Sequence, residues 1–252
     1  MAVIFPKGET DTWQSGRRHR FEIGGHDAWI AEPQNPLPGN PWFWHFEYVD
    51  AFPDRVGTRA LVDLGFYAAY VDVHETLGND EGIARLTTMY DTLLKCGLPG
   101  SGALIGISVG GLFCYRFAAE HPESAACIYT DSPVCAFYRT MNNSTFFRNA
   151  YHCADDDEFE AYPGQPVRMV EAIAQNHIPI LQLTSGQDSS VPPSMHGDIF
   201  AERCRKYGGN IETINRKLYG HHPHGLDNPA PILNFILRYS LNRHEDKTGT
   251  VQ

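Results

Sequence analysis

One serine in this chain has the neighbours that a nucleophile of acyl chemistry needs. Ser108 lies in the run Gly106-Ile-Ser-Val-Gly-Gly111, after a short apolar stretch at 103–105 and before an apolar stretch of helical character. This order predicts a buried strand, a sharp turn and a helix. Glycines fit so tight a turn, and the N–H of Val109 would face an anion that forms at the serine. The pattern therefore indicates nucleophilic chemistry at Ser108.

A serine hydroxyl is a weak nucleophile, so it needs a base, and the base needs an acid that orients it. Asp188 follows an apolar strand pattern at 179–184, and His221 follows a second strand pattern at 211–219. In a doubly wound sheet, active residues lie at the carboxyl ends of the strands. We therefore predict a catalytic triad of Ser108, His221 and Asp188.

Other residues could take the roles predicted for Asp188 and His221. Asp131 also stands at the end of a strand pattern, and we interpret it as a wall of the active site or a structural hydrogen-bonding residue. Asp188 itself could instead cap the helix that follows it. His222 and His224 compete with His221, which we favour because it directly follows the loop glycine.

The three clustered histidines could alternatively bind zinc. The proline at 223 interrupts regular ligand spacing, and no matching carboxylate motif accompanies the histidines. We therefore predict no metal site and no cofactor.

The remaining site residues follow from position. The backbone of Val109 and the backbone of Trp44 or a neighbour are predicted to form the oxyanion hole. The predicted substrate-binding residues are Trp42, His45, Asp131 and His224. Packing in the core is the alternative for one of the two tryptophans, and a surface position is the alternative for His45.

Strand and helix patterns alternate along most of the chain. A Gly-Gly turn predicts a hairpin over 19–32, after a polar lead-in at 1–17. Further strands are predicted at 42–48, 67–73, 103–105, 125–130, 179–184 and 211–219, and helices at 58–65, 80–96, 112–120, 195–207 and 229–239. The alternation predicts an α/β fold with a mostly parallel central sheet flanked by helices and begun by an N-terminal hairpin.

The stretch 135–176 breaks this alternation, since it is polar and aromatic and carries an acidic run at 155–158. We predict that it forms a small cap-like insertion over the active site. The whole chain, 1–252, is predicted to form one domain.

Composition excludes several functions. The chain has 252 residues and a net charge of −10, which argues against a nucleic-acid partner. It contains no apolar stretch of membrane-spanning length and no secretory signal, so we expect a cytoplasmic protein unless a signal has been trimmed. The six cysteines are scattered without a Cys-x-x-Cys pair, so we expect neither an essential disulfide nor a cysteine-ligated metal. The oligomeric state stays open.

From about residue 18 to 240 the chain resembles the α/β-hydrolase superfamily, on three motifs in the chain order Ser, Asp, His. These are the serine turn, the Gly-x-Asp-x-x-Val-Pro loop at 186–192 and the Gly-His-His-Pro-His loop at 220–224. Trp42-x-Trp44, Ile107–Leu112, Tyr129-x-Asp131-x-Pro133-Val134 and the histidine loop together resemble a bacterial esterase-like branch.

The resemblance implies a serine hydrolase that cleaves a carboxylic ester, with an acyl ester on a carbohydrate as the narrower expectation. Its partner would be a small-molecule or carbohydrate ester. Such relatives are expected to carry arginine beside the nucleophile, where this chain has Val109. A peptidase, a thioesterase or a non-catalytic binding protein of the same fold are the alternatives.

Overall fold

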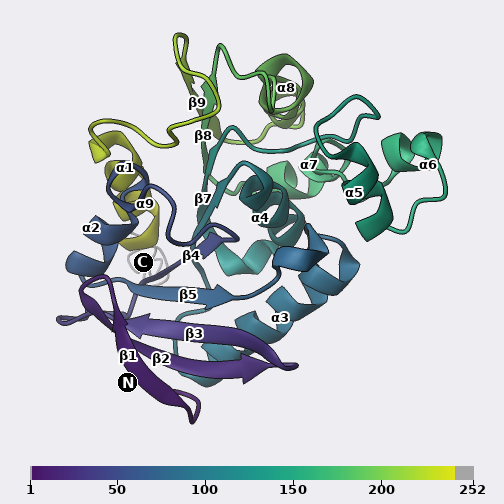
Figure 1. Cartoon of the computed structure of the whole chain (residues 1–252). Helices are drawn as coiled ribbons and strands as arrows, with labels where there is room; N and C mark the ends of the chain where they lie inside the picture. Colours follow the sequence, from purple (N-terminus) through teal and green to yellow (C-terminus); the bar gives the residue numbers. More distant parts are fainter. Residues whose placement is uncertain (1, 242–252) are drawn as a thin grey trace, which may run out of the picture.

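The computed structural model describes residues 2–241 and builds them around a central sheet (Figure 1). Its nine strands are β1 (Glu9–Trp13), β2 (Gly16–Ile23), β3 (His26–Glu32), β4 (Trp42–Phe46), β5 (Tyr67–Val71), β6 (Gly102–Ile107), β7 (Ala125–Asp131), β8 (Ile180–Ser185) and β9 (Ile211–Arg216). They lie in the order β1-β2-β3-β5-β4-β6-β7-β8-β9. Pairing is antiparallel from β1 to β5 and parallel from β5 to β9. The predicted mostly parallel sheet with an N-terminal hairpin is confirmed.

Helices cover both faces of the sheet (Figure 1). They are α1 (Pro53–Val56), α2 (Thr58–Asp63), α3 (Asp80–Lys95), α4 (Val109–Glu120), α5 (Ser144–Ala150), α6 (Asp156–Ala161), α7 (Pro166–Gln175), α8 (Gly197–Lys206) and α9 (Ala230–Leu241), with short 3-10 turns at His74–Thr76, Pro122–Ser124 and Pro193–Met195. Residues of α3, α4, α7 and α8 share one apolar cluster with the strands, and residues of α1, α2 and α9 share another.

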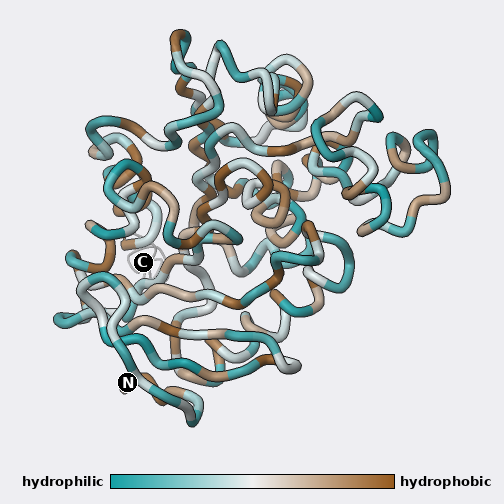
Figure 2. The backbone as a smooth tube through the Cα atoms, in the orientation of Figure 1, coloured by the Kyte–Doolittle hydropathy of each residue, from teal (hydrophilic) through white to brown (hydrophobic). Residues whose placement is uncertain are grey.

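The central strands are buried along their whole length because both of their faces are covered. Every residue of β4, β6, β7 and β8 is buried, and Figure 2 shows apolar colour gathered on these strands. In outer strand β9 the first and last residues are buried, and the four between them are exposed or half-buried. All six cysteines are buried and free. Within residues 2–241, no helix combines the length and apolar character that a membrane span requires.

The N-terminal lead-in differs from the prediction. Residues 9–13 were expected to be irregular but form β1, which pairs with β2 from Glu9↔Arg20 to Trp13↔Gly16. The segment is polar because it is an edge strand with only Trp13 buried. That indole packs 4.8 Å from the ring of Trp29 and donates a hydrogen bond to Asp50. A single tertiary anchor of this kind leaves no periodic signal in the sequence.

The stretch 135–176 divides into two parts. Helix α7 packs against α4 and α8 as a regular member of the helical layer, although the insertion was predicted to extend to 176. Helices α5 and α6 project beside this layer (Figure 1) and share a separate apolar cluster with Leu77, Leu112 and Val191. Buried Arg116 of α4 anchors this part, since its guanidinium lies over the rings of Tyr151 and Tyr162 at 5.7 and 5.6 Å.

Candidate active site

The turn between β6 and α4 holds Ser108 in a strained backbone conformation, with φ 52° and ψ −120°. A Cβ at Gly106 would lie 2.4 Å from the carbonyl oxygen of Gly110, so no larger residue fits there. The serine N–H donates to the carbonyl of Asp131 at the end of the neighbouring strand (2.9 Å). Strand, helix and adjacent strand thus fix the position of the serine from three sides.

The hydroxyl of Ser108 meets the predicted base. Its Oγ lies 2.9 Å from Nε2 of His221, and Nδ1 of the same ring lies 2.7 Å from Oδ2 of Asp188. A carboxylate only accepts, so Nδ1 carries the proton, and Nε2 of the neutral ring is left to accept from the serine. The structure therefore brings the three predicted triad residues into one hydrogen-bonded chain.

Asp188 is held by its own loop. Its Oδ1 accepts the backbone N–H groups of Ser190 and Val191, at 2.9 and 2.8 Å. Burial opposes ionisation of this carboxyl, but the hydrogen bonds from His221 and Val191 outweigh it, and the pKa of Asp188 stays below its ordinary value. Asp188 is thus ionised near neutral pH, as an orienting acid must be.

The histidine loop is held by a buried arginine. Arg216, the last residue of β9, donates to Asp131 Oδ1 (2.6 Å) and Ser185 Oγ (2.6 Å), and to the carbonyls of Pro223 (2.9 Å) and Gly225 (2.7 Å). Asp131 Oδ2 accepts the N–H of Gly225 at 2.6 Å. Both charged side chains are almost fully buried. Asp131 is therefore a structural hydrogen-bonding residue that fixes the loop after β9.

A second arginine holds the same loop from the other side. Arg55 of α1 donates through Nε to the carbonyl of His224 (2.8 Å), pairs with Asp227, and accepts the N–H of Leu226 at its backbone carbonyl (3.1 Å). Gly225 has φ +75°, and a Cβ there would meet the Arg55 backbone at 2.4 Å. Only glycine lets the loop pass this close to α1.

The two predicted donors of the oxyanion hole occupy different kinds of position in the fold. Val109 is the first residue of α4, where backbone N–H groups have no acceptor within the helix. Trp44 is wrong for the second donor, because it lies inside β4, paired with Ala69 and Leu104. The strand ends two residues later, and two residues there approach the turn that carries Ser108: Phe46, whose carbonyl oxygen would lie 2.6 Å from a Cβ of Gly110, and Glu47.

Glu47 has φ 66°, and its Cβ lies 3.7 Å from the position that a Cβ of Gly110 would take. Its carboxylate is buried and pairs with the exposed ring of His74. Burial raises the pKa of Glu47, and the hydrogen bond from Glu47 raises the pKa of His74.

The structure buries all four residues that were predicted to contact the substrate. Trp42, His45, Asp131 and His224 each expose 1% of their surface or less. Trp42 packs its ring over Gly102 and donates its indole N–H to the carbonyl of Pro99 (2.8 Å). Burial lowers the pKa of His45 to about 3, so this ring is neutral in the folded protein. All four side chains are therefore enclosed by the protein in this structure.

The three histidines of the loop converge. One ring nitrogen from each of His221, His222 and His224 lies within 4.8 Å of the others. Pro223 interrupts the spacing of the histidines in the sequence, but their rings lie close together in the folded loop. In this arrangement both nitrogens of His221 are engaged, by Ser108 and Asp188.

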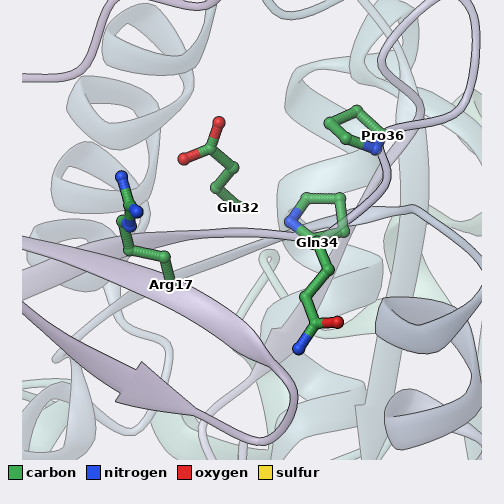
Figure 3. A pocket seen from close by; sticks show the side chains of 5 residues that line it. Arg17, Glu32, Gln34 and Pro36 are labelled. Atoms are coloured by element: carbon green, nitrogen blue, oxygen red, sulfur yellow. The ribbon is translucent and has the colours of Figure 1, made fainter.

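A hollow of about 340 Å³ lies elsewhere, lined by Arg17, Glu32, Pro33, Gln34 and Pro36 (Figure 3). Glu32 ends β3, which runs antiparallel to β5, so the hollow lies at the amino ends of the parallel strands. Ser108 follows the carboxyl end of β6. The hollow is therefore on the opposite edge of the sheet from the triad.

Solved structures share this architecture. The chain is similar to a puromycin-hydrolyzing peptidase of Mycobacterium tuberculosis, with a TM-score of 0.70 and 14% identity over 89% of this chain and 39% of that one. It is similar to Pyrococcus horikoshii acylaminoacyl peptidase, with a TM-score of 0.63 and 15% identity over 82% and 37% of the two chains. It is also similar to Mycobacterium tuberculosis MPT51, with a TM-score of 0.63 and 16% identity over 93% and 100%.

The chain has the α/β-hydrolase fold. The resemblance drawn from the sequence is thus confirmed for the fold. The chain spans less than half the length of either peptidase. No protein-family model and no curated protein matches it.

Within this α/β-hydrolase fold, the sequence prediction missed the residues that support the triad. Arg216, Arg55 and Glu47 were not singled out. Arg216 is followed directly by a lysine, and sequence alone does not tell which of the two basic side chains turns inward. Gly225 carried a usable signal, since a glycine just after the histidines marks a backbone position with special demands.

Proposed function

We propose that this protein is a serine hydrolase that cleaves carboxylic esters through an acyl-enzyme. The observation that carries the proposal is the hydrogen-bonded chain from Ser108 Oγ through His221 to Asp188, at 2.9 and 2.7 Å. A hydroxyl aligned with a neutral imidazole, itself oriented by an ionised carboxylate, is the arrangement that activates a serine.

The reaction follows from these contacts. Ser108 Oγ attacks the ester carbonyl carbon while its proton passes to His221 Nε2, and the imidazolium is stabilised by Asp188. The tetrahedral intermediate collapses, and His221 returns the proton to the departing alkoxide. Water then attacks the acyl-enzyme with His221 as base, the acid is released, and Ser108 regains its proton.

The negative charge of the intermediate needs two N–H donors. We assign the first to Val109 and the second to the backbone of Glu47, which replaces Trp44 in this role. The support is positional: Val109 opens α4, and Glu47 adjoins the elbow directly after β4.

The acyl side of the substrate is inferred to be apolar. Val109, beside the nucleophile, packs against the cluster that includes Leu77, Leu112 and Val191. An acylated carbohydrate remains the narrower proposal for the substrate, but the tryptophans that suggested it are buried. The evidence therefore supports cleavage of an ester more strongly than it supports a carbohydrate as the substrate.

A peptidase is the second candidate, because two similar solved structures carry that activity in their names. Both are more than twice as long as the portion that this chain matches. A screen of p-nitrophenyl esters, acylated sugars, thioesters and aminoacyl p-nitroanilides separates the two. Ester turnover without anilide turnover is expected.

A fluorophosphonate probe tests the nucleophile directly. The probe should label Ser108 in folded protein, and mass spectrometry of the peptide that contains 106–116 locates the adduct. Ser108→Ala should abolish labelling, whereas Ser189→Ala, a change of an exposed serine in the acid loop, should retain it. Labelling at another residue, or none in the folded wild type, rejects the proposal.

A further inference from the structure

The loop after β9 places three imidazoles around one point. The ring centroids of His221, His222 and His224 lie 4.8, 4.9 and 5.0 Å apart, and the rings stand nearly perpendicular to one another. A ring nitrogen from each lies within 4.8 Å of the other two. A tetrahedral zinc ion holds imidazole nitrogens at 2.0–2.1 Å, which places them about 3.4 Å from each other. Side-chain rotations that close each gap by up to about 1.4 Å would complete the set.

Two of these imidazoles already face a carboxylate. His221 presents Nδ1 to Asp188 at 2.7 Å, and Nδ1 of His224 lies 3.5 Å from Oδ1 of Asp131. Ligating histidines commonly face a carboxylate with the nitrogen that does not bind the metal. This leaves Nε2 of both rings as the donor atoms. His224 is buried, and its Nδ1 makes no hydrogen bond among the described residues.

Access and rigidity also suit an ion. His222 is exposed, so an ion can reach the cluster from solvent. The backbone of the loop is fixed by Arg216 and Arg55 through the carbonyls of Pro223, His224 and Gly225. A fixed backbone reduces the ordering that binding would otherwise cost.

We propose that His221, His222 and His224 form a binding site for a divalent transition-metal ion of the zinc type, and that the ion inhibits the enzyme. An ion on Nε2 of His221 occupies the atom that accepts the proton of Ser108. The metal-bound ring then cannot act as a base. The inhibitory consequence rests on the proposed serine hydrolase function, whereas the binding itself does not.

Isothermal titration with Zn²⁺ tests the binding part without any activity. One ion per chain should bind wild-type protein, and His222→Ala should weaken binding at least tenfold. His177→Asn, which changes an exposed histidine on another loop, should bind as the wild type does. Ser108→Ala should keep the site, because the serine supplies no ligand.

A second cluster provides the sharpest control. His26, Asp72 and Glu75 also place ligand atoms within 4.8 Å of one another. Glu75 is already paired with Arg85 at 2.7 Å, which makes it a poorer ligand. The proposal is overturned if His26→Ala loses the single Zn²⁺ site while His222→Ala retains it. It is also overturned if the wild type shows no saturable Zn²⁺ binding.

The inhibitory part uses ester turnover, measured relative to each variant's own metal-free rate. Zn²⁺ should inhibit the wild type reversibly, the inhibitory concentration should rise at least tenfold in His222→Ala, and EDTA should leave the metal-free rate intact. Binding without inhibition, or activity that requires zinc, overturns this part. If no substrate is turned over, the proposed function fails while the titration still decides the metal site.

Discussion

The loops that carry Asp188 and His221 are neighbours, but they are held in place by different means. In the acid loop, Asp188 accepts N–H groups from residues two and three positions further along the chain. In the histidine loop, Arg55 and Asp131 make contacts across 169 and 94 positions in the sequence, and Arg216 donates to carbonyls seven and nine positions further along the chain. The acid loop also receives a contact from another segment, since the N–H of Gln187 donates to the carbonyl of Tyr219 (2.9 Å), but the histidine loop is in addition held by the buried pair of Asp131 and Arg216.

The difference has an energetic consequence. Local turns of the Asp188 kind depend on short-range hydrogen bonds that form wherever the sequence permits them. Asp131 and Arg216, which we call the clamp on the histidine loop, form a buried ion pair. Loss of either partner leaves the other charge buried and unpaired. Changes in the acid loop should therefore act on catalysis, and changes in the clamp should act on stability and catalysis together.

The largest effect is expected from Asp188→Asn. The amide oxygen can still accept from Ser190 and Val191, so the loop should keep its shape, but the carboxylate that orients and stabilises His221 is lost. We expect kcat to fall about 10⁴-fold with little change in the free energy of unfolding. Steady-state kinetics and urea unfolding measure the two quantities. His221→Ala should be equally inactive, and a tenfold effect or less would show that another acid serves the base.

Asp131→Asn should affect both quantities. Removal of one partner of a buried pair typically costs about 3–5 kcal/mol of stability, because Arg216 is left unpaired. A small displacement of His221 should lower kcat about 10–100-fold, less than the change at Asp188. Unfolding by urea and kinetics on the folded fraction provide the measurements.

A double variant sharpens this test. Asp131→Asn combined with Arg216→Gln should lose less stability than the sum of the single changes, because neither charge is then buried alone. If Asp131→Asn abolished turnover as Asp188→Asn does, at unchanged stability, Asp131 would be part of the reaction and not of the clamp.

Acid pH should lower the stability of the folded protein through His196. His196, just before α8, is buried, and its Nδ1 lies 3.2 Å from the Cys135 N–H and 3.3 Å from the Ala136 N–H. Burial lowers the pKa of His196 to about 4, from an ordinary value of 6.5. The unfolded chain therefore binds the extra proton first, and stability that is complete above pH 6.5 is lost as the pH falls towards 4.

The slope for this one group is about 1.4 kcal/mol per pH unit, or about 2 kcal/mol between pH 6.5 and 5. Urea unfolding at pH 7 and pH 5 should show a smaller loss in His196→Gln than in the wild type. His177→Asn, a change of an exposed histidine, should lose as much as the wild type. Equal losses in all three proteins would contradict the assignment.

The smallest effect is expected from Arg55→Ala. This side chain contacts the outer side of the histidine loop, and its ion pair with Asp227 is largely exposed, so the pair contributes little. Because Arg216 still holds the loop, kcat should fall less than about fivefold. A loss as large as that of Asp131→Asn would show that α1, and not the buried pair, positions His221.

The sequence by itself determined the frame and the order of the reactive residues. Buried strands appeared as apolar runs, and the turn around Ser108 was visible from its glycines, of which Gly106 is required by a close contact with the nearby Gly110 backbone. Asp188 and His221 could be placed because each follows a strand, and parallel strands end at one edge of the sheet.

Only the tertiary structure decided which side chains face the site and which lie beneath it. An aromatic or charged residue at a strand end looks the same in sequence whether it turns inward or outward. Trp42, His45, Asp131 and His224 were therefore assigned to the substrate, although the folded chain buries them. The role of Arg216 is apparent only in the folded structure, where this β9 residue contacts both Asp131 of β7 and the histidine loop. The contacts that hold the histidine loop include some between residues 94 and 169 positions apart, and no local pattern encodes them.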